Sequence, residues 1–290
     1  MDYRDFVHPE DEAALKTLKS VPGIDVLMKK INEIGIERRL RGLNLANYIR
    51  LSEKQLPELY KHLPPICERF GIDIPEFYLQ MTPTPNAFTM GDSIVTITIT
   101  TGLLDLCDDT LLDAVLAHEC GHILCHHVLY NSVAQAILNG IPLVSGLTSA
   151  TIGTALFYWA RRSEYSADRA SAVYTSPEIA IRMNALLAGG VPGRFGEINM
   201  EEWMKQGEEY ERLKEDHLWD KTLHVFNVAQ WDHPFNSARA LQIAKWAKTD
   251  QYKRLCGEAV LLKEGHTCPN CGKHIPDSWT FCRFCGHKFE

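Results

Sequence analysis

The segment His118-Glu119-Cys120-Gly121-His122 has residue types and a spacing that could bind a metal ion and activate water. On a helix, residues four apart lie about 40° apart around the axis, so both imidazoles leave one face. One zinc ion could then take a nitrogen from each, at about 2.0–2.1 Å. Glu119 would lie beside the first ligand, placed to accept a proton from activated water without ligating the metal. The spacing predicts a zinc hydrolase site.

A catalytic zinc also needs a third protein ligand and an open position for water. A third histidine ten residues after His118 is excluded, because that position is Val128. His126 lies one turn beyond His122, but three ligands in a row on one straight helix cannot surround a metal. His126 and His127 are therefore expected behind the ligands or on the surface.

Glu164 is the better candidate for the third ligand. It lies four residues before Asp168, so on a helix both carboxylates point the same way. Glu164 would complete a His-His-Glu site, and Asp168 would accept the second N–H of a zinc-bound histidine and fix its tautomer. The alternative for this pair is a solvated, charged helix face.

These motifs resemble the gluzincins that include the HtpX heat-shock protease and the CAAX prenyl endopeptidase. The resemblance rests on the HExxH segment, on Glu164-x-x-x-Asp168, on the run from Asn86 to Gly91, and on His233-Pro234 followed by Arg239. It covers residues 10–239, and the four motifs occur in the family's order. It implies a zinc endopeptidase that cleaves polypeptides and acts in protein quality control.

The resemblance also assigns roles to individual residues. His118, His122 and Glu164 would bind zinc, and Glu119 would be the general base. Asn86, Ala87 and the strand around them would contact the substrate backbone. His233 and Arg239 would stabilise the tetrahedral intermediate or hold the wall of the active site. Without the resemblance, a histidine before proline in a tryptophan-rich loop is more typical of a packed loop residue.

The predicted mechanism is attack of an activated water on a peptide carbonyl, with Glu119 carrying the proton to the leaving amine. The substrate would lie extended and pair with the edge of the strand expected at Ile94 to Thr100. A non-catalytic scaffold or chaperone that keeps the fold is the alternative. The intact Glu119 argues against it, since a scaffold needs no general base.

The elements that must position these residues follow from periodicity. Ile94 to Thr100 alternates β-branched residues with threonine and predicts a strand, within a small sheet from Phe77 to Thr100. Helices are expected from the period of apolar residues and from capping signals. They are predicted over residues 12–19, 24–40, 52–70 with a kink at Pro64-Pro65, 110–130, 177–188, 201–216 and 235–248.

Residues 127–160 contain no Asp, Glu, Lys or Arg. The run is too short for two membrane spans, and a single span would put His122 and Glu164 on opposite sides of a bilayer. We expect a pair of short helices buried in the core or against a protein partner. Peripheral contact with a membrane is the alternative.

The last residues carry four of the nine cysteines as Cys268-x-x-Cys271 and Cys282-x-x-Cys285. Four thiolates at this spacing predict a closed, structural zinc site, here a zinc ribbon whose folding depends on the metal. The expected cofactors are thus one catalytic and one structural zinc ion.

Composition sets the remaining limits. The 290 residues are 45% hydrophobic and carry a formal net charge of -7, so no nucleic-acid partner is expected. The acidic first residues lack an apolar stretch, which predicts a cytoplasmic protein. A composition break near residue 263 predicts a peptidase domain over 1–262 and a zinc ribbon over 263–290. The expected fold class is α+β, a mainly helical zincin-like domain with a small β-sheet, plus the ribbon.

Overall fold

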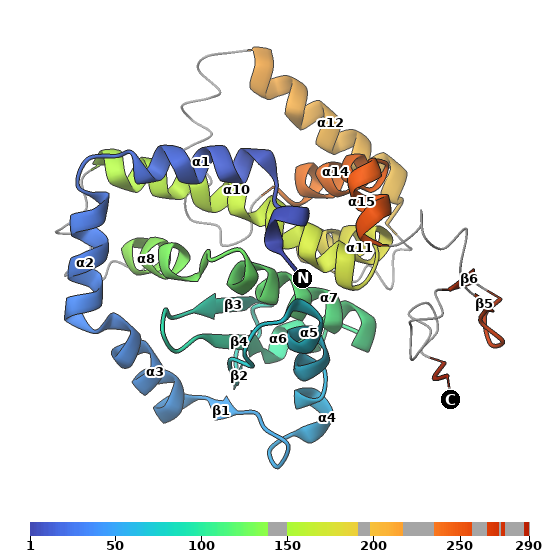
Figure 1. The fold of residues 1–290 in the computed structure, drawn as a ribbon, viewed down its shortest axis with the longest axis horizontal. Helices are drawn as coiled ribbons and strands as arrows, with labels where there is room; N and C mark the ends of the chain where they lie inside the picture. The colour runs from blue at the N-terminus through green and yellow to red at the C-terminus, as the bar shows by residue number, and fades with distance from the viewer. Residues whose placement is uncertain are drawn as a thin grey trace.

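A computed structural model describes residues 1–138, 150–190, 198–216, 235–256, 266–272, 274–275 and 287–289 of the chain. It is mainly helical and carries one four-stranded sheet, which confirms the predicted fold class. In the view of Figure 1, the sheet lies on one side of α7 (Asp109–Leu124) and α8 (Val128–Leu138). A layer of helices built from α1 (Pro9–Lys19), α10 (Ala150–Tyr174) and α11 (Pro177–Gly189) lies on the other side.

The N-terminal arm begins with a 3-10 turn, η1 (Tyr3–Asp5), followed by α1. The single helix predicted from Ile24 to Leu40 is instead two, α2 (Ile24–Ile34) and α3 (Ile36–Asn47). The break is at Gly35, whose φ of 69° is left-handed and ends the first helix. Apolar residues of α1 and α2 form a core with α8 and α10, so this N-terminal segment packs on those two helices.

The sheet has the order β1-β2-β4-β3, from the strands β1 (Ile49–Arg50), β2 (Glu76–Gln80), β3 (Ala87–Met90) and β4 (Thr96–Thr100). β2 and β4 are parallel, whereas β3 runs antiparallel to β4 with Thr89 opposite Ile97. The expectation that a substrate pairs with Ile94 to Thr100 is therefore wrong. Both edges of β4 are occupied by neighbouring strands, and the edge strand on this side is β3.

Short helices flank the sheet. The helix predicted over 52–70 is two pieces, α4 (Pro57–Tyr60) and α5 (Leu63–Phe70), and α6 (Thr101–Leu104) follows β4. Pro64 and Pro65 lie in the first turn of α5, where proline's missing N–H costs nothing. The break thus precedes the prolines. Gly71 closes α5 in the left-handed conformation.

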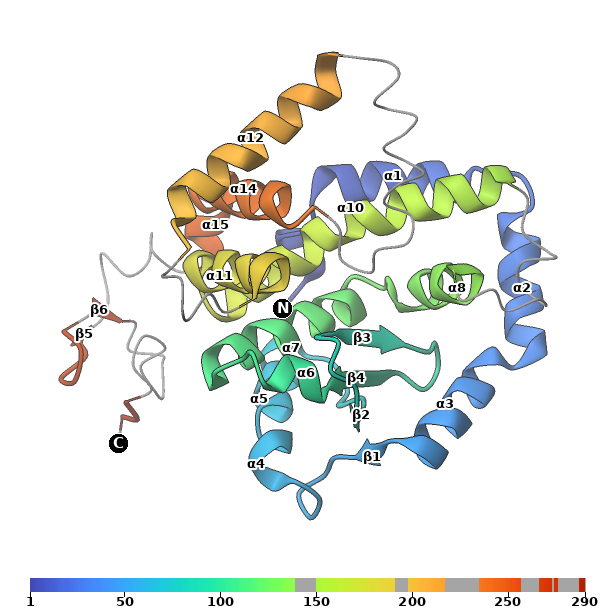
Figure 2. The ribbon, with the colours of Figure 1, turned by 180° about the vertical axis from the view of Figure 1, so that it is seen from behind.

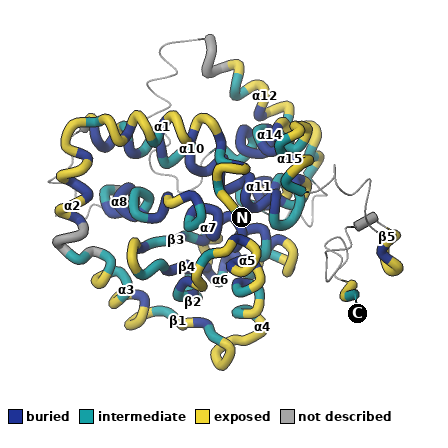
Figure 3. The backbone as a smooth tube through the Cα atoms, viewed as in Figure 1, coloured by how far each residue is buried: buried dark blue, intermediate teal, exposed yellow. Residues whose placement is uncertain are grey.

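The long helix predicted over 110–130 ends early. Cys125 caps α7, His126 has a left-handed φ of 59°, and α8 begins at Val128. α7 packs along α10, and α11 packs against both (Figure 2). Within the described ranges, the other helices are α12 (Met200–Asp216), α14 (Asn236–Ala247) and α15 (Asp250–Leu255). α7 is buried over most of its length, as the dark blue tube in Figure 3 shows.

The uncharged run of 127–160 falls in α8 and in the first turns of α10, with residues 139–149 outside the described part. The second helix is not short, because α10 has 25 residues and continues into the segment that carries Glu164. Apolar side chains of the run, including Val133, Leu156 and Trp159, are buried against α1 and α2. Within the described ranges, no helix combines the length and apolar character that crossing a bilayer requires.

Near the C-terminus, β5 (His266–Thr267) and β6 (His274–Ile275) form an antiparallel pair. Cys268 and Cys271 follow β5 in the turn of this hairpin. Cys282 and Cys285, the other two predicted ligands of the structural zinc, lie outside the described residues.

Candidate metal centre

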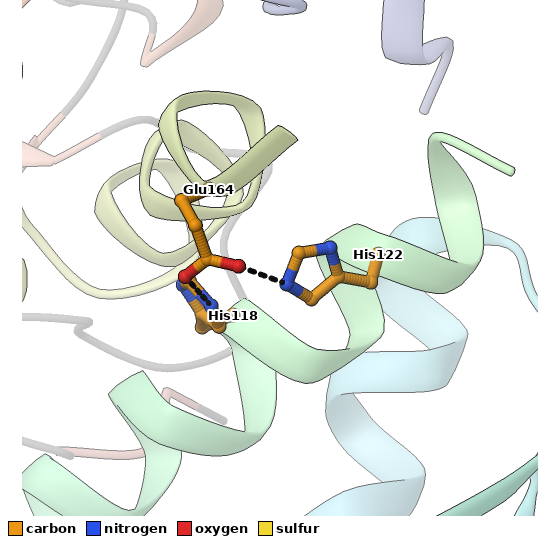
Figure 4. A group of neighbouring side chains, drawn as sticks. All are labelled: His118, His122 and Glu164. Carbon is orange, nitrogen blue, oxygen red and sulfur yellow. Dashed lines mark ion pairs between the residues drawn. The ribbon is translucent and has the colours of Figure 1, made fainter. Parts of the chain in front are cut away.

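The HExxH segment lies in the second half of α7. Asp108 caps this helix, and its carboxylate accepts a hydrogen bond from the Leu111 N–H at 2.9 Å. His118 and His122 leave the same face and point toward α10, which supplies Glu164 (Figure 4). The side chains of all three are buried.

The three side chains are spaced as ligands of one small cation. One oxygen of Glu164 lies 3.4 Å from His118 Nε2, and the other lies 3.3 Å from His122 Nε2. One ligand atom can be chosen from each residue so that all lie within 4.8 Å of one another. Tetrahedral zinc with bonds of 2.0–2.1 Å holds its ligand atoms about 3.4 Å apart. The donor set of two imidazoles and a carboxylate also fits zinc.

Close contact between α7 and α10 makes this spacing achievable. Gly121 faces α10, and a Cβ placed on it would lie 2.6 Å from the Ala170 Cβ and 3.1 Å from the Ala167 Cα. No side chain larger than hydrogen fits between the helices at this point. The glycine inside the HExxH segment therefore sets the distance between the helix that carries the histidines and the helix that carries Glu164.

Behind His118 lies a buried ion pair. The Asp168 Oδ1 is 3.2 Å from His118 Nδ1, on the side of the ring opposite Glu164. Arg239 of α14 donates to both oxygens of Asp168, at 2.8 and 2.6 Å, and its Nη1 lies 3.2 Å from a Glu164 oxygen. Arg239 is only 1% exposed. It joins both carboxylates and thereby links α14 to the candidate ligands.

Behind His122 lies a second network, formed by His127 and Asp11. His122 Nδ1 is 3.0 Å from His127 Nδ1, and His127 Nε2 is 2.9 Å from an oxygen of Asp11. Asp11 also accepts hydrogen bonds from Trp159 Nε1 at 3.0 Å and from Ser166 Oγ at 2.6 Å. The sequence expectation placed His127 behind the ligands or on the surface, and the structure places it behind His122. The sequence spacing of the predicted site residues gave no indication that Asp11 belongs to this network.

Glu119 is buried and turns toward the sheet. Its Oε2 accepts a hydrogen bond of 2.6 Å from Thr89 Oγ1, on β3. A small cavity adjoins it, lined by Asn86, Ala87, His118, Glu119, Met183 and Arg239, among others. The structure thus brings the predicted substrate-contacting residues to the same cavity as the predicted base and one predicted ligand.

The electrostatics favour positive charge between the helices. Burial alone would lower the pKa of His118, but the hydrogen bonds and negative charges of Asp168 and Glu164 raise it. Burial lowers the pKa of His122, which favours the neutral imidazole that a metal requires. Burial alone would raise the pKa of Asp168, but the charge of Arg239 lowers it to about 2. The carboxylate that supports His118 is therefore ionised.

His233, a predicted site residue, lies outside the described residues. His126, the nominal alternative ligand, turns away from the pair and contacts the Tyr3 ring edge-on, with centroids 5.6 Å apart. Its left-handed backbone ends α7 instead.

Two family models match the chain. The model described as peptidase family M48 matches residues 54–247, and the model described as a zinc-ribbon domain matches residues 267–289. The first spans the whole candidate site except Asp11. The second begins just before Cys268.

Curated relatives point the same way. The plastoglobule-localized metallopeptidase 48, chloroplastic, of Arabidopsis thaliana is 29% identical over 266 residues, which cover 89% of this chain and 77% of that protein. An HtpX protease homologue of Pelotomaculum thermopropionicum is 34% identical over 99 residues, and one of Nostoc is 30% identical over 104. The chain spans only 35% and 36% of these two relatives. No solved structure matches.

Proposed function

This chain belongs to peptidase family M48 and is a zinc metallopeptidase, and from that premise we propose that His118, His122 and Glu164 bind its catalytic zinc. The observation that carries this proposal is the ligand spacing, with Glu164 oxygens 3.4 and 3.3 Å from the two Nε2 atoms. These values agree with the separation of about 3.4 Å expected around tetrahedral zinc. Two ligands would come from α7 and one from α10, leaving the cavity side open.

When bound, zinc would lower the pKa of water to about 7 and polarise the substrate carbonyl. Glu119 acts as the general base: its carboxylate accepts a proton from the attacking water and then donates it to the leaving amine. Thr89 holds one carboxylate oxygen of Glu119 by the 2.6 Å hydrogen bond. The other oxygen is left to face the cavity and carry the proton.

Arg239 supports the site by position. Its guanidinium bridges Asp168 and Glu164, so it holds the carboxylates that orient His118 and complete the ligand set. Arg239 also lines the cavity, so we propose that its guanidinium contacts the developing oxyanion as well. His233 is proposed as a further donor to that oxyanion on the family resemblance alone.

The substrate backbone pairs with β3. The Asn86 carbonyl accepts a hydrogen bond from Thr100 N, so Asn86 points its carbonyl toward β4. In an antiparallel pair the direction alternates, so the backbone N–H and carbonyl groups of Thr89 point away from β4. An extended polypeptide could add there as a further strand. It would then pass the cavity that holds Glu119.

Replacing Glu119 by glutamine tests the proposal. We expect Glu119→Gln to retain its zinc and lose nearly all chelator-sensitive cleavage of casein, because glutamine cannot carry the proton. Glu58→Gln, on the exposed α4, is the matched control and should cleave normally. Full activity in Glu119→Gln would refute the mechanism. A wild-type chain that binds zinc but cleaves nothing would favour the non-catalytic scaffold.

The resemblance to a heat-shock protease supports unfolded polypeptides as the substrate class and protein quality control as the setting. Unfolded casein should therefore be cleaved faster than a folded protein of equal size. The cytoplasmic location expected from the N-terminal composition stays a prediction. Fractionation tests it together with the alternative of a membrane or protein partner for residues 127–160.

The C-terminal residues are proposed as a separate zinc ribbon over 263–290, beyond a peptidase domain over 1–262. The match of the zinc-ribbon model over residues 267–289 supports this division. Cys268, Cys271, Cys282 and Cys285 would hold one structural zinc, so the chain should contain two zinc ions. Metal analysis of the purified protein gives that ratio directly.

A further inference from the structure

A chain of three buried side chains runs from His122 back to the N-terminal helix. His122 contacts His127 through the two Nδ1 atoms at 3.0 Å, and His127 Nε2 lies 2.9 Å from the Asp11 Oδ2. His127 and Asp11 are each 1% exposed. Asp11 lies in α1, outside residues 54–247 that match the family model.

The positions of the protons follow from these contacts. A carboxylate accepts only, so the 2.9 Å contact with Asp11 requires a proton on His127 Nε2. In the tautomer that carries this proton, His127 Nδ1 accepts and His122 Nδ1 donates across the 3.0 Å contact. The Asn131 amide group, 3.5 Å from the same His122 nitrogen, then turns its oxygen toward it. His122 is thereby left with a bare Nε2. That nitrogen is the one that faces Glu164, at 3.3 Å.

We propose that Asp11, acting through His127, is a positioning residue that holds His122 in the tautomer and ring orientation needed to bind the catalytic zinc. This inference rests on the proposed function, since it treats His122 as a ligand. The opposite tautomer would place a proton on Nε2 and exclude the metal. His118 receives the same support directly, because Asp168 lies 3.2 Å from its Nδ1.

The backbone is shaped to place His127 there. His126 takes the left-handed conformation directly after α7, which turns the chain so that His127 N donates to the carbonyl of His122 at 2.9 Å. The ring of His127 then packs against that of His122, with centroids 5.3 Å apart. Asp11 is fixed from the other side by hydrogen bonds from Trp159 and Ser166, both on α10.

The contrasting possibility is that His127 only fills space, since its ring also packs edge-on against Trp159 with centroids 5.5 Å apart. His127→Phe separates the two roles. Phenylalanine keeps an aromatic ring in that packing but offers His122 no acceptor. His127→Gln restores one acceptor and one donor, so it should rescue a hydrogen-bonding role and not a packing role.

The experiment measures zinc affinity in the full chain by competition with chelating dyes of graded strength, alongside thermal unfolding. We expect His127→Phe and Asp11→Ala to weaken the catalytic zinc about 10- to 100-fold, the usual effect of losing a group that orients a ligand. His127→Gln should recover most of that loss. Leu156→Ala is the control for fold stability: it leaves a cavity in the same core but removes no hydrogen bond of the Asp11–His127–His122 chain, so its zinc affinity should stay near that of the parent.

Two results would overturn the inference. One is parental zinc affinity in His127→Phe. The other is an equal loss in Leu156→Ala, which would mean that zinc affinity follows fold stability. His122→Ala identifies the catalytic ion and separates this inference from the proposed function. If His122→Ala keeps both zinc ions, the ligand assignment itself is wrong, whereas loss of one ion there with no effect in His127→Phe refutes only the positioning role.

Discussion

Replacing Gly121 by alanine should push α7 and α10 apart and so separate the histidines from Glu164. The added Cβ would lie 2.6 Å from the Ala170 Cβ and 3.1 Å from the Ala167 Cα. Non-bonded carbons prefer about 3.5–4.0 Å, so the first pair must separate by about 1 Å. The same displacement acts across the site, where the Glu164 oxygens lie 3.4 and 3.3 Å from their histidines.

Two opposing effects set the size of the change. Glycine to alanine in a helix interior stabilises by about 1 kcal/mol through helix propensity. Overpacking a tight helix contact costs about 1–3 kcal/mol. The clash in Gly121→Ala involves helix backbone as well as a side chain. We therefore expect the overpacking cost to exceed the gain in helix propensity, so the free energy of unfolding should fall. A displacement of about 1 Å at a catalytic centre lowers activity on the order of 100-fold.

Thermal unfolding, zinc affinity and casein cleavage would be measured together. Gly42→Ala, in α3, is the control for propensity, because its Cβ would meet nothing within 4 Å; it should be more stable and fully active. Adding Ala170→Gly to Gly121→Ala removes the 2.6 Å clash and should restore most of the activity. If Gly121→Ala gains stability as Gly42→Ala does and keeps its activity, the helix spacing does not set the ligand geometry.

Three further outcomes test other parts of the structure. Arg239→Met leaves buried carboxylates without their cation and should lower the free energy of unfolding by about 3–5 kcal/mol. The loss should be smaller when Asp168→Asn is already present, and a double-mutant cycle measured by urea unfolding would show this. Burial lowers the pKa of His8 from 6.5 to about 4; the unfolded chain therefore takes up the proton first, and the unfolding free energy should fall by about 2 kcal/mol from pH 7 to pH 5. His8→Asn, which keeps a helix-capping side chain, should remove that pH dependence. Replacing Cys268 and Cys271 by serine should release one of two zinc ions and leave casein cleavage intact, as metal analysis and a cleavage assay would record.

The central part of the site could be predicted because it obeys helix periodicity. His118 and His122, and likewise Glu164 and Asp168, are four residues apart, and that spacing alone puts each pair on one face. Periodicity could not predict that these two helices, α7 and α10, pack against each other. The close approach at Gly121 depends on small residues of α10, and no rule for a single helix identifies that partner.

The main errors came from chain reversals and strand order. His126 ends α7 with a left-handed residue that is not glycine, so the sequence showed no stop signal, and the predicted helix ran on to residue 130. β4 has the strongest strand pattern, and it is a central strand that pairs with β2 and β3 and is buried at all five residues. The edge of the sheet on this side is the shorter β3, whose four residues gave a weak signal.

The supports of the two histidine ligands differ in how far they lie along the chain. His118 is oriented by Asp168, from the same helix as Glu164, so one motif contains both the third ligand and the support. His122 is oriented through His127 by Asp11, more than a hundred residues before it in the sequence. A domain that began at residue 54, where the family model begins, would lack this carboxylate and leave His127 without its acceptor. The packing of α1 on α10 therefore supports the metal site in this proposal, which favours a peptidase domain that includes α1.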